Sequence, residues 1–280
     1  MLTHTQPLAI LALSLSLGWA PLWAHTLTVE IEPQGTAGLV MDREGSYLAD
    51  AQGQPVAYFG GWDGWGKEAV APASVTFKTL SALPTSLNIV WLDGDDDQFW
   101  GGRMALPRQD IVRLLRQHPQ EGFSRLIVSL ADKGRLTLWL GSSQHEVQLG
   151  DEWQAQKTDR PWADFIGSLP STRQGQSRAE FVKTETKRRT NPYNDELFVF
   201  LAEKQPIANF TYRITRDDGF HYCGHSNAQG ETRRVNTGTT TANLAVYSGT
   251  CTLLEQEPPT PNPIRIVPNV IRSMQRLLPY

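Results

Sequence analysis

The chain has 280 residues, of which 40% are hydrophobic and 20% are charged, a composition typical of a soluble globular protein rather than a disordered one. Its 26 basic and 29 acidic side chains give a net charge of -3, and this balance argues against a nucleic-acid partner. The two cysteines, Cys223 and Cys251, are too few for a disulfide scaffold or a four-cysteine zinc site, but they suffice for one bridge in an oxidising compartment.

The first predicted element is a signal peptide over residues 1–24. This segment contains no Lys, Arg, Asp or Glu, and residues 7–19 (PLAILALSLSLGW) form an apolar run of the length of a signal-peptide core. Cleavage after Ala24 is expected to release a soluble periplasmic chain that begins at His25, because no cysteine stands near the cleavage site to carry a lipid. The alternative is a buried N-terminal helix.

Residues 25–168 are predicted to form an α+β domain built on an antiparallel sheet. The segment HTLTVEIEP places Leu27, Val29 and Ile31 on one face, at the two-residue period of a half-buried strand. Further strands are predicted in ASVTFKTL, SLNIVWLD, QFWGGRMAL, SRLIVSLAD and RLTLWLG. The acidic connection at residues 93–97 indicates a hairpin between the second and third of these.

A helix is predicted near residues 107–117. Pro107 suits a first helical position, Asp110 suits the positive end of the helix dipole, and Ile111, Leu114 and Leu115 supply a buried stripe.

Residues 169–195 are predicted to be a polar, basic linker, because the stretch STRQGQSRAEFVKTETKRRTNPYND is poor in large apolar side chains. An electrostatic docking strip for an acidic partner or a lipid surface is the alternative use of its charges.

Residues 196–254 are predicted to form a small immunoglobulin- or transthyretin-like β-sandwich. The runs LFVFLA, ANFTYRI, GFHYCGHS, ETRRVNT and ANLAVYS recur about every ten residues, which is the spacing of a small sandwich. Because so small a unit buries little apolar surface, we expect a stabilising disulfide between Cys223 and Cys251.

Residues 255–280 read as a proline-rich tail that ends in a short amphipathic helix. The helical stripe comprises Val267, Val270, Ile271, Met274, Leu277 and Leu278. Docking of this helix onto a domain is the favoured interpretation, and contact with a membrane surface is the alternative.

The sequence contains several incomplete catalytic or metal-binding patterns. His221, Cys223 and His225 alternate along one strand, a geometry that suits zinc or copper, but a disulfide would remove the thiolate. His25, as a new amino terminus, resembles the copper-binding histidine of the lytic polysaccharide monooxygenases in that residue alone. Residues 93–104 lack the glycine and glutamate of a calcium loop, and residues 141–145 match a serine-hydrolase elbow only in part. We therefore expect no cofactor and no enzymatic activity.

Two segments carry resemblances to known families. Residues 55–140, with GGWDGWG followed by LPTSLNIVWLDGDDDQFWGGRMALPRQDIVRLL, resemble a group of uncharacterised Gram-negative envelope proteins. Residues 197–237 are similar to small sandwich modules of type VI secretion spike and effector proteins, through the motifs PIA, YRI, DG and NAQGET. The second resemblance implies a rigid scaffold that contacts another protein.

These observations predict a periplasmic, non-enzymatic binding protein associated with type VI secretion. An immunity protein that neutralises a cognate secreted effector is favoured, because a signal peptide sends the chain to where an incoming toxin arrives. The alternatives are an adaptor or chaperone that loads an effector onto the spike, and a copper-binding or hydrolytic enzyme. Trp62 and Trp65, with Asp63 between them in a glycine-rich loop, are the candidate partner-binding residues. The alternative is that both rings fold back to cover the sheet.

Overall fold

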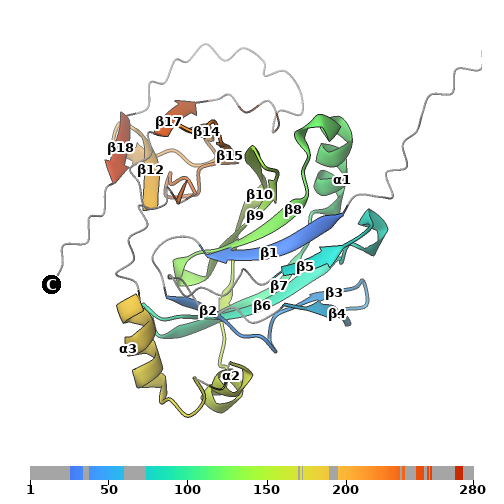
Figure 1. Ribbon diagram of the computed structural model, residues 1–280. Helices are drawn as coiled ribbons and strands as arrows, with labels where there is room; N and C mark the ends of the chain where they lie inside the picture. The colour runs from blue at the N-terminus through green and yellow to red at the C-terminus, as the bar shows by residue number, and fades with distance from the viewer. Residues whose placement is uncertain are drawn as a thin grey trace, which may run out of the picture.

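A computed structural model describes the chain at residues 26–33, 38–59, 74–169, 171, 173–188, 195–233, 235–236, 244–248, 251, 253 and 269–273. The predicted mainly-β class is confirmed, since the described residues form three sheets and far more of them lie in strands than in helices. The sheets lie in layers, and the helices of residues 162–168 and 178–188 lie at one end of the stack (Figure 1).

The central layer is an eight-stranded sheet with the order β17-β14-β15-β10-β9-β8-β1-β5. Its strands are β1 (Leu27–Pro33), β5 (Ser74–Phe77), β8 (Arg125–Leu130), β9 (Arg135–Gly141), β10 (His145–Gln154), β14 (Thr211–Arg216), β15 (His221–His225) and β17 (Leu244–Ser248). Two of its pairings, β1 with β8 and β10 with β15, are parallel, whereas an antiparallel sheet was expected.

The second layer is a six-stranded sheet that packs on one face of the central sheet. It consists of β2 (Leu39–Met41), β3 (Tyr47–Ala49), β4 (Pro55–Tyr58), β6 (Ser86–Asp93), β7 (Gln98–Ala105) and β11 (Gln156–Lys157). Strands β6 and β7 form the antiparallel hairpin expected around residues 93–97. Alternate side chains of β1, β8, β9 and β6, such as Ile31, Val128, Leu138 and Trp91, fill the core between the two layers.

Helix α1 (Arg108–Gln117) corresponds to the helix expected near residues 107–117, and it buries Ile111, Leu114 and Leu115 in this same core. Pro107 stands at the N-cap.

The third layer is a small sheet on the opposite face of the central sheet. It comprises β12 (Asp195–Ala202), β13 (Gln205–Pro206), β16 (Val235–Asn236) and β18 (Asn269–Ser273). Phe198 and Phe200 of β12 pack with Trp139 of β9 and with Tyr212 and Ile214 of β14. The C-terminal strands thus form two packed layers, one of which continues the N-terminal sheet through the β10–β15 pair. Strand pairing therefore crosses the boundary expected near residue 195.

The expected linker at residues 169–195 requires correction, because it contains helix α3 (Arg178–Arg188). Together with α2 (Trp162–Ser168), α3 packs on the outer face of the second sheet, where Phe181 and Phe165 are fully buried. Phe181 and the partly buried Val182 anchor this otherwise polar helix on the sheet.

The prediction of a helix in the C-terminal tail is wrong for residues 269–273, because these residues form strand β18 (Asn269–Ser273). This strand pairs antiparallel with β12, from Leu197 opposite Ser273 to Leu201 opposite Asn269. The β-branched pair Val270 and Ile271 suits a strand as well as a helix stripe, and the pairing with β12 decides between them.

Candidate functional site

A polar cavity lies between the central sheet and the turns that join the C-terminal strands. Its volume is about 410 Å³, within the usual range for small-molecule sites. The walls come from β9 and β10, from the one-turn helix η4 (Asp132–Gly134), and from residues 208–209 and 225–233. Elements far apart in sequence therefore form one polar recess.

A β-bulge in β10 shapes one wall of this cavity. The pairing of β10 with β9 shifts register between Leu149 and Trp153. Gly150 in this irregular stretch has φ +69°, a conformation that favours glycine. The two following residues, Asp151 and Glu152, line the cavity. Burial raises the pKa of Glu152, and Arg135 opposes this shift.

A second wall holds Arg135 of β9 among carboxylates. Its Nη1 donates to Glu231 Oε2 at 2.8 Å, and its Nη2 donates to the Asp132 carboxylate. Burial alone would lower the pKa of Arg135, but these hydrogen bonds and the charge of Asp132 hold it above the usual value. Asn227 fixes the turn that presents Glu231, since its Oδ1 accepts from the amide of Glu231 at 2.9 Å.

Arg233 is the most deeply buried cation at the cavity. Its Nη2 donates to Glu32 at 2.8 Å and its Nη1 donates to Glu146, so strands β1 and β10 are both tied to the segment after β15. Its side chain is only 4% exposed. Burial would lower the pKa of Arg233, yet the charges of Glu146 and Glu32 keep it raised. Burial in turn raises the pKa of Glu32.

The polar residues of this face were missed because the sequence pattern was interpreted as half-exposed strands. Along β9, Leu138 and Leu140 face the large core while Thr137 and Trp139 face the cavity side. Glu32 on β1 likewise alternates with the core residue Ile31. The alternation of apolar and polar residues shows which side chains lie on each face of a strand. It does not show that a third sheet covers the polar face.

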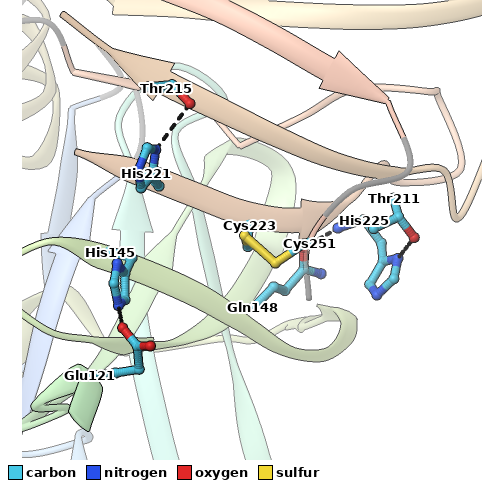
Figure 2. The surroundings of a disulfide bond; sticks show 9 residues. All are labelled: Glu121, His145, Gln148, Thr211, Thr215, His221, Cys223, His225 and Cys251. Atoms are coloured by element: carbon cyan, nitrogen blue, oxygen red, sulfur yellow. Dashed lines mark hydrogen bonds and ion pairs between the residues drawn. A yellow bond between two sulfur atoms is a disulfide. The ribbon is translucent and has the colours of Figure 1, made fainter. Parts of the chain in front are cut away.

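The predicted cysteine pair forms a disulfide, as expected. Cys223 of β15 is bonded to Cys251, with their Cα atoms 5.8 Å apart (Figure 2). Both residues are buried and belong to the core between the central and second sheets. The bridge consumes the thiolate that a metal site at this strand would need.

The histidines on β15 each contact a threonine of the neighbouring strand β14. His221 Nδ1 lies 3.0 Å from Thr215 Oγ1, and His225 Nδ1 lies 3.1 Å from Thr211 Oγ1 (Figure 2). His225 also lines the cavity. Burial lowers the pKa of both histidines, and for His225 the charge of Asp151 acts in the opposite direction.

A second histidine contact lies at the start of the β10–β15 pair. His145 of β10 is directly opposite His221, their rings are stacked with centroids 6.4 Å apart, and His145 Nε2 contacts the Glu121 carboxylate. Within the described part of the chain, no three His, Cys, Asp or Glu side chains come together as a metal site.

The remaining predicted site residues, Trp62, Asp63, Trp65 and His25, lie outside the described residues. Of the helices that the structure describes, none has the length and apolar content required to cross a membrane.

No protein-family model matches the chain, and comparisons with curated proteins and with solved structures find no significant similarity.

Proposed function

We propose that this chain is an exported, non-enzymatic protein-binding protein, which receives a segment of its partner in the cavity between the central sheet and the C-terminal turns. The observation that carries this proposal is the cavity itself. It is concave and polar, and the paired strands β9 and β10 supply one side of its wall, including Arg135 and Gln148. A site on paired strands is held in one geometry before a partner arrives, which reduces the entropy lost on binding.

Export is supported by two independent features. Residues 1–24 have the composition of a signal peptide, and the disulfide between Cys223 and Cys251 is a bond that persists in oxidising compartments. We place the mature protein in the periplasm on these grounds.

The partner that we propose is a secreted toxic effector, with this chain as its immunity protein. The support is the resemblance of the motifs PIA, YRI, DG and NAQGET in residues 197–237 to those of type VI secretion modules, together with the expected export to the compartment in which delivered toxins act. An adaptor that loads effectors would instead work before secretion, in the cytoplasm.

Co-expression tests this function. A toxic effector encoded beside this chain, as the proposal requires, is expressed with a periplasmic signal, alone or with the full-length chain, and survival is measured. Purified proteins are then mixed and analysed by size-exclusion chromatography. We expect rescue of growth and a stable complex. If the effector remains toxic and no complex forms, the immunity function is wrong.

A further inference from the structure

Strand β17 is an edge of the central sheet. It pairs with β14 on one side, and none of the described strands pairs with its other side. Alternate residues of an edge strand direct their N–H and C=O groups away from the sheet, where a further extended chain can pair with them. Edge strands commonly avoid such pairing through proline, charged side chains or a bulge. Strand β17 (LAVYS) has no proline and no charged residue, and it pairs with β14 without a bulge, so its outer edge is open to pairing.

Other edges that the structure describes are better protected. Strand β4, at one edge of the second sheet, begins with Pro55 and has a register shift opposite β3. At the opposite edge of that sheet, β11 has only two residues. Strand β18 of the third sheet contains the charged residue Arg272. Strand β5, at the far end of the central sheet, has four residues and is followed by Lys78. This contrast indicates that β17 is kept available for an added strand.

An arginine without a carboxylate partner lies beside this edge. Arg213 of β14 is directly opposite Tyr247 of β17, and its guanidinium carbon lies 4.8 Å from the centroid of the Tyr247 ring, which is 45% exposed. Arg216 on the same strand is paired with Asp218 at 2.6 Å, whereas no described carboxylate pairs with Arg213. Of the three guanidinium nitrogens of Arg213 only Nε is buried, so the two Nη nitrogens remain accessible to a carboxylate.

A second copy of this chain fits the edge poorly. An antiparallel pairing of two β17 strands would be symmetric, and it would bring the Arg213 side chains of both copies to the same face of the joined sheet. Because β17 contains no Asp or Glu, neither copy would supply a counter-charge there. The occupant that fits is an extended segment with an acidic side chain.

We propose that β17 binds an extended segment of the partner protein as an added strand, with a Glu or Asp side chain of that segment on Arg213. The main-chain hydrogen bonds would supply affinity, and the guanidinium would select for the carboxylate. This inference rests on the proposed binding function and adds a second contact, since no residue of β17 lines the cavity.

Short blocked peptides test the proposal on the full, disulfide-bonded chain. The probe acetyl-Thr-Ile-Glu-Ile-Thr-amide is compared with the same peptide carrying Gln in place of Glu, by NMR titration at low salt. We expect the Glu probe to bind about three-fold more tightly, a ratio within the range that an exposed ion pair supplies. Two N-methylated forms of the Glu probe, each blocked along one edge of the peptide, test strand pairing. One form should lose binding and the other should retain it, because only one edge of an added strand faces β17.

Matched variants locate the carboxylate. Arg213→Gln should bind the Glu and Gln probes equally, whereas Arg43→Gln, which removes an exposed cation from the turn between β2 and β3, should keep the preference. Near-ultraviolet circular dichroism checks that each variant is folded. The N-methylated probes and hydrogen exchange use the wild type, so the inference stays testable if Arg213→Gln is not folded. In the free wild type we expect alternate β17 amides to exchange fast, and the Glu probe at saturation should slow their exchange.

Equal binding of the Glu and Gln probes would overturn the inference, as would equal binding of the two N-methylated forms. Slow exchange of every β17 amide in the free chain would also overturn it, because the edge would then already be covered, by this chain or by a second copy. The protein complex provides a separate result. If the partner binds but Arg213→Gln leaves its affinity unchanged, the edge inference fails and the binding function stands. If the probes behave as expected but no partner complex forms, the binding function fails alone.

Discussion

The guanidinium carbon of Arg233 lies 4.8 Å from the ring centroid of Trp139, and this contact joins a buried ion network to the aromatic core of the C-terminal layers. Removing the guanidinium would leave the Glu146 and Glu32 carboxylates without their shared cation. Breaking a buried pair in this way typically costs about 3–5 kcal/mol. We therefore expect Arg233→Ala to lower the free energy of unfolding by about that amount, as measured by urea denaturation.

The control for this prediction is Arg113→Ala. Arg113 pairs with Asp110 at the surface of α1, and exposed pairs of this kind contribute about 0–1 kcal/mol. Similar losses in both variants would show that the buried network has no special role. Neutralising the network with Arg233→Met, Glu146→Gln and Glu32→Gln together should recover part of the lost stability.

The local sequence pattern does not predict this network. Glu32, Glu146 and Arg233 stand at polar positions of strands or turns, and local pattern alone assigns them to solvent. The burial of Glu146 and Arg233 and their pairing with Glu32 arise from two long-range events, the parallel pairing of β10 with β15 and the packing of β12 over the central sheet. By contrast, the mainly-β class, the β6–β7 hairpin and the disulfide follow from local periodicity, turn residues and cysteine count, and the structure contains all three.

The disulfide is predicted to stabilise the folded chain by restricting the unfolded one. Cys223 and Cys251 are separated by 28 residues. In the chain-entropy model, closing a loop of that length lowers the entropy of the unfolded chain. This raises the free energy of the unfolded chain by about 3.5 kcal/mol. The double variant Cys223→Ala with Cys251→Ala should therefore unfold at a markedly lower urea concentration than the oxidised protein. The wild type unfolded with a reductant should match the variant, and unchanged stability in both cases would contradict the prediction.

Stability is predicted to fall on acidification below about pH 6.5 because of the histidines on β15. Burial depresses the pKa of His221 and of His225 below the value of 6.5 expected for the unfolded chain. The unfolded chain therefore binds these protons more tightly, and the stabilisation present above pH 6.5 is lost as the pH falls through the folded values. Urea denaturation at several pH values between 8 and 5 measures how the free energy of unfolding depends on pH.

Replacement of the histidines isolates their contribution. The variant His221→Gln with His225→Gln loses the titrating groups, so its stability should depend less on pH over this range. At pH 8 the histidines are neutral. The difference in unfolding free energy between variant and wild type at this pH therefore measures only the lost packing and hydrogen bonding. A variant whose pH dependence equals that of the wild type would assign the slope to other groups.

The tryptophans of the glycine-rich loop remain a prediction from sequence. If Trp62 and Trp65 anchor the partner, replacing either with Ala should weaken the complex by about 2 kcal/mol or more and leave the melting temperature unchanged. If the rings instead cover the sheet, the same change should lower the melting temperature by a comparable free energy. Asp63→Asn, between them, tests whether charge in this loop contributes to the affinity.

The segment from Ser177 to Arg188 begins with a helix signal that is visible in the sequence. Ser177 and Glu180 form a capping box, in which the Ser177 amide donates to Glu180 Oε2 at 3.0 Å and the Glu180 amide donates to Ser177 Oγ at 3.3 Å. This spacing predicts a helix start, whereas the low apolar content of the segment favours a linker. The hydrogen bonds to Ser177 lower the pKa of Glu180.

Phe181 decides between a packed helix and a linker. Its ring is fully buried, with centroids 5.4 Å from Trp162 and 5.8 Å from Phe165. Truncating a buried aromatic side chain typically costs about 3–5 kcal/mol, because the contacts are lost and a cavity remains. We expect Phe181→Ala to destabilise the chain by that amount in urea denaturation, whereas Lys183→Ala, on the exposed side of the same helix, should change the unfolding free energy by less than about 0.5 kcal/mol. Equal, small effects of the two substitutions would mean that α3 is not docked on the second sheet in solution.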